Sequence, residues 1–365
     1  MNTELNRKLQ ACVVGATGYV GQRFITLLSD HPWFEITGVT ASPRSRGKTY
    51  AEAVSGRWKM EDPIPESVAS LEVMSTADID RFSNQSDLVF CAVDMEKEPL
   101  ISLEEAIAMR EVPVISNNSA NRWTPDVPVI LPEVNADHLQ LLEAQKKRLN
   151  TARGFIVVKP NCSIQSYVPA LTPLMEYGPE YVFVATYQAV SGAGKTLGEW
   201  PEMQENVIPF ISGEEEKSEL EPLKIWGDFA GDHIELAKKP VISAQCYRVP
   251  VLEGHTAAVF VKFRRTIDQN EILMHWREFS SVPQALELPS APNPFIRYID
   301  DHNRPQPRLD AMSRHGMGIT VGRLRDDPIY DVKFTCLSSN TVRGAAGGAI
   351  LTAELLYRQG YIEKR

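Results

Sequence analysis

The chain has 365 residues and carries 38 lysines and arginines against 47 aspartates and glutamates, which gives a formal net charge of −9. Its length predicts two domains, and its 43% hydrophobic and 23% charged residues are typical of a globular protein. The acidic balance argues against a nucleic-acid-binding protein, and no stretch approaches the roughly 18 consecutive apolar residues of a membrane span.

The first 150 residues alternate strand-like and helix-like segments. Alternation of this kind predicts an α/β domain with a parallel sheet and helices on both faces. Short apolar runs predict strands at 10–15, 34–41, 87–93 and 112–116, and amphipathic spacing predicts helices at 19–29, 100–110 and 135–148.

Beyond residue 155 the strand-like segments follow one another directly. This pattern predicts an α+β domain built on a largely antiparallel sheet. Strands are predicted at 155–158, 181–187, 241–250, 256–263, 319–324 and 330–337, and helices at 163–177 and 270–279.

Two segments of the second half do not follow this pattern. The polar, acidic segment 200–226 predicts a long irregular excursion. The helical segment after Asn340 is rich in small and apolar residues, and we expect it to pack back on the first domain. The predicted domains are therefore 1–157 with 340–365, and 158–339.

A glycine-rich turn, Gly15-Ala-Thr-Gly18-Tyr-Val-Gly21, joins the first predicted strand to the first predicted helix. Glycines here allow a tight turn and a close approach of backbone amides to a pyrophosphate, which the positive end of the helix attracts. We interpret this segment as a dinucleotide-binding turn. The alternative is a glycine-rich connection that binds nothing.

The residues after the second predicted strand indicate which dinucleotide binds. An NAD site usually has an acid there to hold the ribose hydroxyl. This chain instead has Ser42, Arg44 and Ser45, and the nearby Glu35 lies at the opposite end of the strand. Hydroxyl and guanidinium groups suit a 2′-phosphate, so the loop favours NADP. A solvated basic loop is the alternative.

Cys162 is the candidate nucleophile. It lies in Lys159-Pro-Asn-Cys-Ser, between a predicted strand and a predicted helix. A cysteine at a helix N-terminus gains thiolate character from the helix dipole. By contrast, Cys12, Cys91 and Cys336 lie inside apolar strands and are expected to be buried and inert.

The five cysteines are scattered and form no CxxC pair. Neither a disulfide framework nor a metal site is expected from them. The N-terminus is polar and lacks the pattern of a signal peptide. These features predict a cytoplasmic protein without a bound metal.

His255 is the candidate general base among the seven histidines. It lies in Arg248-Val-Pro-Val-Leu-Glu-Gly-His255, between two strand-like runs, where a hairpin would place Arg248 beside it. A purely structural histidine is the alternative at this position. His138 and His275 lie in amphipathic helices and are expected at the surface.

Several motifs occur in a fixed order along nearly the whole chain: GATGYVG, PNCS, TYQAVSGAG, RVPVLEGH and SSNTVRGAAGG. In order and spacing they resemble the aspartate-semialdehyde dehydrogenase family, in the branch found in archaea and fungi. The family is similar in architecture to phosphorylating glyceraldehyde-3-phosphate dehydrogenase. The resemblance therefore implies a Rossmann domain, a catalytic and dimer-forming domain, and a homodimer or homotetramer.

The resemblance also implies roles for the matching residues. Cys162 would attack a carbonyl and form a thioester, His255 would act as general acid and base, and Gln188 would orient the substrate. The substrate-binding residues would be Arg248 at the α-carboxylate, Glu214 at the amino group, and Arg122, Asn161 and Lys217 at the phosphate. The run Glu214-Glu215-Glu216-Lys217 leaves open which of the three acids faces the amino group. NADP would be contacted by Gly15, Thr17, Gly18, Val20, Ser42, Arg44, Ser45, Gly192 and Asn340.

The implied reaction is the NADPH-dependent reductive dephosphorylation of L-aspartyl-4-phosphate to L-aspartate 4-semialdehyde, a step of lysine, threonine and methionine biosynthesis. Two enzyme alternatives share its thioester chemistry. N-acetyl-glutamyl-phosphate reductase usually has Gly-Cys in its cysteine motif, and its substrate lacks a free amine. Malonyl-CoA reductase is the second. A regulatory dinucleotide-binding protein without catalysis is a third alternative, although it would need only the glycine turn.

Overall fold

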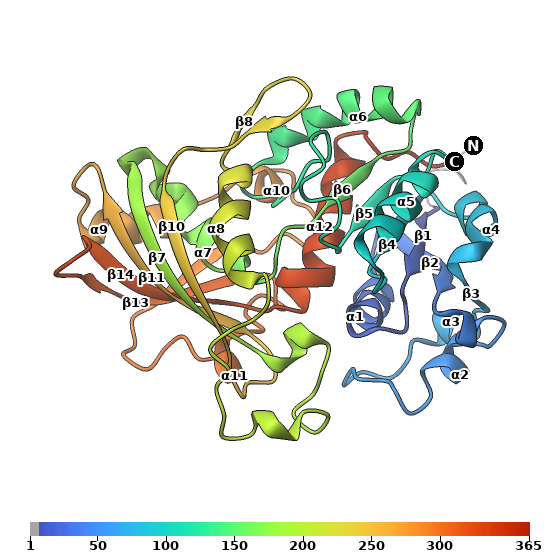
Figure 1. Ribbon diagram of the computed structural model, residues 1–365, viewed down its shortest axis with the longest axis horizontal. Coiled ribbons are helices and arrows are strands. Elements are labelled where there is room, and N and C mark those ends of the chain that lie inside the picture. Colours follow the sequence, from blue (N-terminus) through green and yellow to red (C-terminus); the bar gives the residue numbers. More distant parts are fainter. Residues whose placement is uncertain (1–6) are drawn as a thin grey trace.

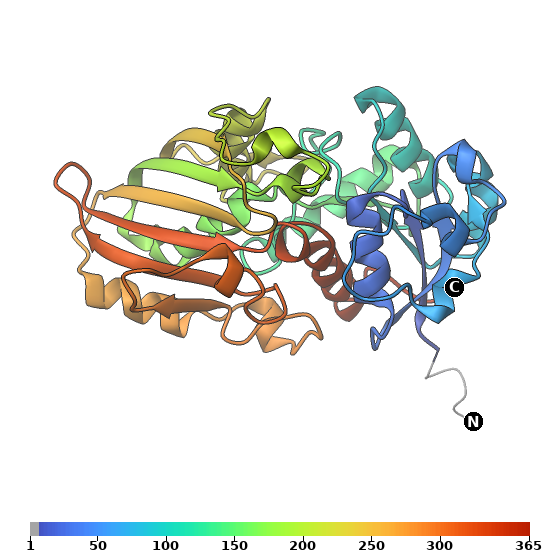
Figure 2. The ribbon, with the colours of Figure 1, turned by 90° about the horizontal axis from the view of Figure 1, so that it is seen from below.

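Two six-stranded sheets form the two halves of the protein (Figure 1). The computed structural model describes residues 7–365, so residues 1–6 of the first predicted domain lie outside the described residues. Figure 2 shows the two halves at opposite ends of the molecule, with helix α12 (Gly347–Arg358) between them. The predicted combination of an α/β half with an α+β half is confirmed.

The first sheet is entirely parallel, with the strand order β3-β2-β1-β4-β5-β6. This is the strand order of a Rossmann fold. Its central strands are nearly continuous apolar runs because both faces are covered, as in LQACVV of β1. The strands are β1 (Leu9–Val14), β2 (Phe34–Thr40), β3 (Val73–Met74), β4 (Leu88–Cys91), β5 (Val114–Ser116) and β6 (Ile156–Val158).

Helices flank this sheet. α1 buries Phe24, Ile25 and Leu28. Leu28 follows the other two by four and three residues, so all three lie on one face of the helix. The helices are α1 (Tyr19–Leu28), α2 (Tyr50–Val54), α3 (Glu66–Ala69), α4 (Ile79–Asn84), α5 (Lys97–Ala108) and α6 (Leu141–Leu149), the last preceded by a 3-10 turn, Ala136–Gln140.

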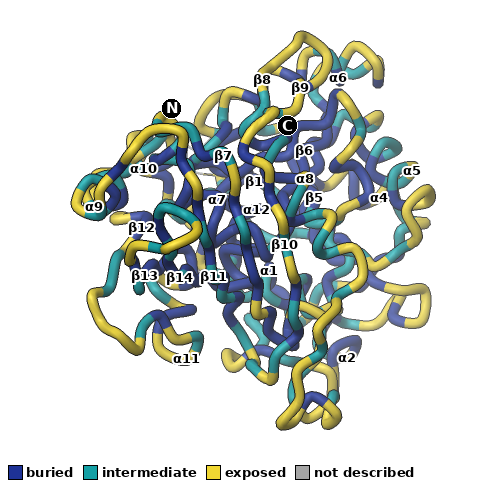
Figure 3. Tube along the Cα trace, turned by 60° about the vertical axis from the view of Figure 1, so that its left-hand side comes forward, coloured by how far each residue is buried: buried dark blue, intermediate teal, exposed yellow. Residues whose placement is uncertain are grey.

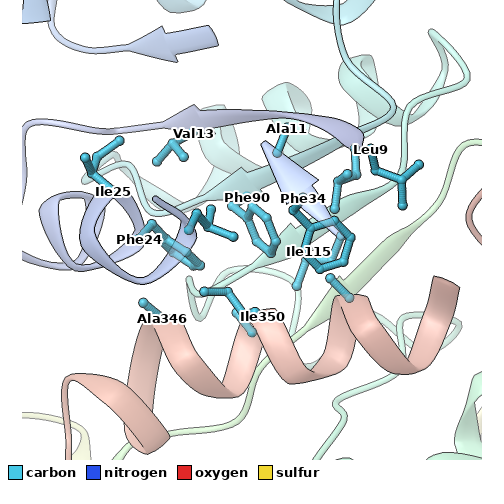
Figure 4. Close-up of a cluster of buried hydrophobic side chains, with 14 of the residues drawn as sticks. Leu9, Ala11, Val13, Phe24, Ile25, Phe34, Phe90, Ile115, Ala346 and Ile350 are labelled. Atoms are coloured by element: carbon cyan, nitrogen blue, oxygen red, sulfur yellow. The ribbon is translucent and has the colours of Figure 1, made fainter. Parts of the chain in front are cut away.

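The C-terminal segment packs back on the first sheet, as expected. Ala346 and Ile350 belong to the same buried cluster as Phe24, Phe34 and Phe90 (Figure 4). Every residue from Gly347 to Leu356 of α12 is buried, because this helix lies between the two halves. The chain therefore returns to its first half after completing the second.

The second sheet has the order β10-β7-β11-β14-β13-β12. Its three central pairs are antiparallel, whereas the edge pairs β10–β7 and β13–β12 are parallel. The prediction of a largely antiparallel sheet is thus confirmed, with a parallel pair at each edge. The strands are β7 (Pro179–Gln188), β10 (Val241–Arg248), β11 (His255–Phe263), β12 (Ile296–Ile299), β13 (Ile319–Asp326) and β14 (Val332–Ser338), and β8 (Asp228–Phe229) and β9 (Ile234–Glu235) form a separate hairpin.

Residues 7–365 bury one face of the second sheet and leave the other open. Residues along β11 alternate between buried and more exposed, and the same alternation is visible along β10 (Figure 3). The open face carries exposed Tyr181, Tyr187 and Val241. The helices of this half are α7 (Tyr167–Leu171), α8 (Glu214–Ile225), α9 (Gln269–Glu278), α10 (Val282–Ala285) and α11 (Pro307–Asp310).

Three predicted elements differ from the structure. The strand predicted at 155–158 is β6, which completes the first sheet rather than opening the second. The helix predicted at 163–177 is three short helices, with Pro169 and Pro173 interrupting the run because proline lacks an N–H donor. Residues 214–225, predicted as irregular, form α8, and Glu214, Lys217 and Glu221 of this helix face the site.

Among residues 7–365 no helix is long and apolar enough to cross a bilayer. The same residues contain no group of three or more His, Cys, Asp or Glu side chains placed to hold a metal ion.

Candidate active site

Strand pairing brings several candidate residues together at one end of the strands of the second sheet. β10 and β7 are parallel, and Arg248 and Gln188 are register partners at their carboxyl ends. β11 runs antiparallel to β7, so it begins at the same end with His255, opposite Ser338 of β14. The segment that leads to Asn340 starts there as well.

Arg248 and His255 lie close together, but the predicted hairpin is wrong. In a hairpin β10 and β11 would pair with each other. Instead β10 pairs with β7 in parallel, and β7 separates β10 from β11. Both side chains approach Gly192: a Cβ on this glycine would lie 2.8 Å from Arg248 Nη1 and 3.1 Å from His255 Cε1. Their proximity thus comes from neighbouring strand ends and a shared glycine loop.

Cys162 reaches the same place from the first half of the chain. It follows β6, and its Sγ lies 3.5 Å from Nε2 of His255. The main-chain N–H of Ala189 donates to Nδ1 of His255 over 3.1 Å. Because Nδ1 accepts, the proton of the neutral ring is assigned to Nε2, toward the sulfur. His255 can therefore donate to a thiolate or to an oxyanion formed beside it.

Burial sets the pKa values of this pair. Burial and the nearby Arg248 lower the pKa of His255 to about 3, which keeps the ring neutral near pH 7. Burial and Glu214 raise the pKa of the Cys162 thiol, and Lys159 is the largest influence in the opposite direction. The predicted helix dipole contributes little, because Cys162 precedes the turn Ser163–Gln165 rather than a long helix.

Glu214 is the centre of a group of polar contacts beside the thiol. Asn161 Nδ2 donates to both of its carboxylate oxygens over 3.0 Å. Gln188 Nε2 lies 3.3 Å from Glu214 Oε2, and Lys217 Nζ lies 3.0 Å from Oε1. Although burial acts in the opposite direction, Lys217 and these hydrogen bonds hold the pKa of Glu214 below its ordinary value.

The other two acids of the run lie elsewhere. Glu215 accepts a hydrogen bond from the main-chain N–H of Cys246, and Glu216 is exposed. Glu214 is thus the acid that contacts both Asn161 and Gln188.

Arg122 and Lys217 line one cavity of about 680 Å³. Arg122 Nη1 donates to Glu221 over 2.8 Å, and Nε donates to the carbonyl oxygen of Lys159 over 3.1 Å. Within residues 7–365 its Nη2 has no hydrogen-bond partner. The cavity therefore presents guanidinium and ammonium donors to an anion of phosphate size.

The glycine-rich turn has the geometry that a dinucleotide requires. Gly15 has φ of +87°, and a Cβ on it would lie 2.5 Å from the carbonyl oxygen of Ala92. Among the described residues no side chain caps the N-terminus of α1, whose N-cap is Gly18, and its first turn has no acid. The first amides of α1, which include that of Val20, are therefore available to a pyrophosphate.

The loop after β2 fits a 2′-phosphate. Ser42 and Arg44 are exposed and Ser45 is buried. In the described part of the chain Arg44 has no hydrogen-bond partner, whereas Arg46 is paired with Asp78. No acid follows β2 directly, so the residues present fit NADP better than NAD.

Asn340 connects two loops of the site. Its Oδ1 accepts from the N–H of Gly254, and its Nδ2 donates to Ser191 Oγ, both over 2.8 Å. The carboxamide thus ties the loop before His255 to the loop that contains Gly192.

The predicted inert cysteines are confirmed as buried, and burial raises the pKa of Cys12, Cys91 and Cys336. The prediction of a surface His138 is wrong. Its ring contacts Asn135 and the carbonyl oxygen of Gly227, because the turn before α6 packs against the second half.

Two buried charges of the site were not predicted from the sequence. Glu221 contacts Arg122, and Lys224 donates to the carbonyl oxygen of Arg122 over 2.7 Å. With Glu214 and Lys217 they recur every three or four residues, which is the spacing of one helix face. Recognition of α8 as a helix would have revealed them.

A Rossmann sheet, a second mixed sheet and a buried cysteine–histidine pair are the features of a nucleotide-dependent dehydrogenase. Residues 10–142 match the family model of the semialdehyde dehydrogenase NAD-binding domain, and residues 171–343 match that of the semialdehyde dehydrogenase dimerisation domain. The sequence is 44% identical to the aspartate-semialdehyde dehydrogenase of Archaeoglobus fulgidus, over 96% of this chain and 98% of that protein.

A fungal relative and a solved structure agree with this. The aspartate-semialdehyde dehydrogenase of Trichophyton rubrum is 40% identical, over 97% of this chain and 99% of that protein. The crystal structure of the Candida albicans enzyme with NADP superposes with a TM-score of 0.87 at 35% identity, over 98% of this chain and 100% of that one. The chain belongs to the aspartate-semialdehyde dehydrogenase family.

Proposed function

We propose that the protein catalyses the NADPH-dependent reductive dephosphorylation of L-aspartyl-4-phosphate to L-aspartate 4-semialdehyde. The observation that carries this proposal is the 3.5 Å approach of Cys162 Sγ to His255 Nε2 at the strand edge that also bears Gln188 and Arg248. A thiol beside a neutral imidazole is suited to acyl transfer through a thioester.

The first step forms the thioester. The Cys162 thiolate attacks the acyl carbon, the bond from that carbon to the phosphate oxygen breaks, and phosphate leaves with the electron pair. When bound, the reduced nicotinamide supplies a hydride to the thioester carbon. His255 Nε2–H donates a hydrogen bond to the resulting oxyanion, which collapses to the aldehyde and returns the thiolate.

The substrate's charged groups match the side chains around the thiol. Arg248 would bind the α-carboxylate, because Nη1 donates to Ala189 O over 2.7 Å and the rest of the guanidinium remains available. Glu214 would hold the amino group, and Gln188 would orient the substrate. Arg122, Asn161 and Lys217 would bind the phosphate in the adjoining cavity.

NADP would bind across the carboxyl edge of the first sheet. The free amides of α1 and the exposed Arg44 support this placement. The residues we assign to NADP are Gly15, Thr17, Gly18, Val20, Ser42, Arg44, Ser45, Gly192 and Asn340.

We further propose that two chains associate through the open face of the second sheet. Exposed Tyr181 and Tyr187 and half-buried Phe183 and Phe260 lie on this face. An apolar face of this kind is typical of a permanent interface. We also propose two domains, 1–157 with 340–365 and 158–339. The proposed compartment is the cytoplasm, because free cysteines suit a reducing environment.

The test is NADP reduction with aspartate semialdehyde, measured with and without phosphate. We expect phosphate-dependent turnover and its loss in Cys162→Ser, because a hydroxyl is a far weaker nucleophile than a thiolate. N-acetyl-glutamate semialdehyde in the same assay, and malonyl-CoA with NADPH in the reductive direction, serve as competing substrates. Preferential turnover of either one, or full activity of Cys162→Ser, would overturn the proposal.

A further inference from the structure

Helix α8 presents a row of charged side chains to the active site. Glu214, Lys217, Glu221 and Lys224 lie on one face of the helix, because they are three or four residues apart. Glu214 and Lys217 are already assigned to the substrate. Glu221 lies one turn further along and is only 2% exposed, so its charge must be compensated by protein groups.

Both oxygens of Glu221 are engaged. Oε1 accepts from Arg122 Nη1 over 2.8 Å, and Oε2 accepts from the main-chain N–H of Asn161 over 2.7 Å. Asn161 directly precedes Cys162. One carboxylate therefore connects the arginine of the phosphate cavity to the backbone that carries the nucleophile.

Arg122 is held from three directions. Besides Glu221, its Nε donates to Lys159 O, and its own carbonyl oxygen accepts from Lys224 Nζ. Within residues 7–365 these contacts leave Nη2 of Arg122 without a partner, so it is available to a phosphate. A guanidinium with a fixed plane binds a phosphate more tightly than a mobile one, because less side-chain entropy is lost on binding.

We propose that Glu221 is a positioning residue for the phosphate step: it fixes the plane of Arg122 and the backbone of Asn161, and so the distance from bound phosphate to the Cys162 sulfur. This inference rests on the proposed function, since it needs phosphate as leaving group and co-substrate. Glu221 acts through Arg122 and Asn161, which occupy its two carboxylate oxygens.

The direction in which phosphate binding changes distinguishes a positioning role of Glu221 from a purely electrostatic one. Glu221 and exposed Glu216 both line the cavity of Arg122 and Lys217. If only through-space charge mattered, removing either carboxylate would strengthen the binding of a phosphate anion. If Glu221 positions Arg122, its removal must weaken phosphate binding instead.

The experiment measures KM for phosphate, KM for NADP and the dissociation constant of NADP in wild type, Glu221→Gln and the matched control Glu216→Gln. Glutamine can replace only one of the two acceptor contacts, because its amide nitrogen is a donor. We expect KM for phosphate to rise by roughly 10-fold or more in Glu221→Gln. We expect it to stay unchanged or to fall in Glu216→Gln, and NADP binding to stay unchanged in both.

A double-variant comparison shows whether Glu221 acts through Arg122. In an Arg122→Ala background, Glu221→Gln should cause a much smaller further loss of phosphate affinity than in wild type, because only its contact with Asn161 then remains to be lost. Glu221→Asp keeps the charge and should give an intermediate KM for phosphate, which provides a second readout if Glu221→Gln folds poorly.

The outcomes are distinguishable. Wild-type turnover with an unchanged or lowered KM for phosphate in Glu221→Gln would overturn the role of Glu221 alone. A parallel loss of NADP affinity and thermal stability would show a merely structural residue and would overturn it too. Absence of phosphate-dependent turnover in the wild type would overturn the proposed function, and this role with it.

Discussion

Nε2 of His255 lies 3.5 Å from Sγ of Cys162, although the two residues are 93 positions apart. Cys162 follows β6 of the first sheet, whereas His255 begins β11 of the second. The pair therefore forms only when the segment after β6 packs against the start of β11. The main-chain N–H of Ala189 holds the ring from the other side and directs Nε2–H toward the sulfur.

Because the pKa of His255 is lowered to about 3, this residue makes stability depend on pH. The unfolded chain binds a proton at the histidine below about pH 6.5, while the folded chain does not, so stability falls as the pH decreases through this range. Between about pH 7 and about pH 5 we expect the free energy of unfolding of wild type to fall by about 2 kcal/mol because of His255. In His255→Gln this contribution to the pH dependence should be absent. Urea unfolding at both pH values, at one protein concentration, measures the difference. Equal losses in both proteins would show that His255 titrates normally.

Gly192 must lack a side chain for the site to form. A Cβ there would lie 2.8 Å from Arg248 Nη1 and 3.1 Å from His255 Nε2. We expect Gly192→Ala to lower kcat/KM for aspartate semialdehyde by roughly 10-fold or more, because both side chains must shift. Gly198→Ala is the control, since a Cβ at Gly198 would meet only Thr196 Oγ1 at 3.9 Å. Similar kinetics of the two variants would contradict this prediction.

Arg44 should decide the cofactor preference. Removal of a guanidinium from a 2′-phosphate costs about 1.5–3 kcal/mol, so Arg44→Ala should raise KM for NADP by roughly 10- to 100-fold and leave KM for NAD unchanged. Arg46→Ala is the matched control, because Arg46 is already paired with Asp78. If Arg44→Ala keeps the preference for NADP, the arginine does not contact the 2′-phosphate.

Glu214 should affect both the substrate and the thiol. After burial, its carboxylate is the next cause that raises the pKa of Cys162. We therefore expect Glu214→Gln to raise KM for aspartate semialdehyde and to move the alkylation of Cys162 by iodoacetamide to lower pH. Glu216→Gln should change neither the KM nor the alkylation profile. An unshifted profile in Glu214→Gln would show that its charge does not reach the sulfur.

The open face of the second sheet should control assembly. Tyr187→Asp places a charge on this face, and an interface that buries it pays a large desolvation cost. We expect a dimer for wild type and a shift toward monomer for Tyr187→Asp, measured by light scattering after size-exclusion chromatography. Met109→Asp, at an exposed position of the first half, is the control and should stay dimeric. A dimeric Tyr187→Asp would place the interface elsewhere.

Much of the fold follows from local patterns. Alternating apolar runs and amphipathic segments predict the first sheet and its helices, because each signal lies within one element. The helix at 214–225 is not predicted, for the opposite reason: its charged residues suggest a solvated segment. In the structure, however, Glu214 contacts Asn161 and Gln188, and Glu221 contacts Arg122. A polar helix face that lines a site cannot be told from a surface loop by composition alone.

The sequence by itself determined the glycine turn at Gly15, the absence of an acid after the second strand and the placement of Cys162 after a strand. These features depend on residue types within a few positions of one another. Only the tertiary structure decided that β7 separates β10 from β11, that Arg248 and His255 meet around Gly192, and that Glu221 joins Arg122 to Asn161. The physical reason is that strand order and buried ion pairs depend on packing between distant segments, which no local pattern encodes.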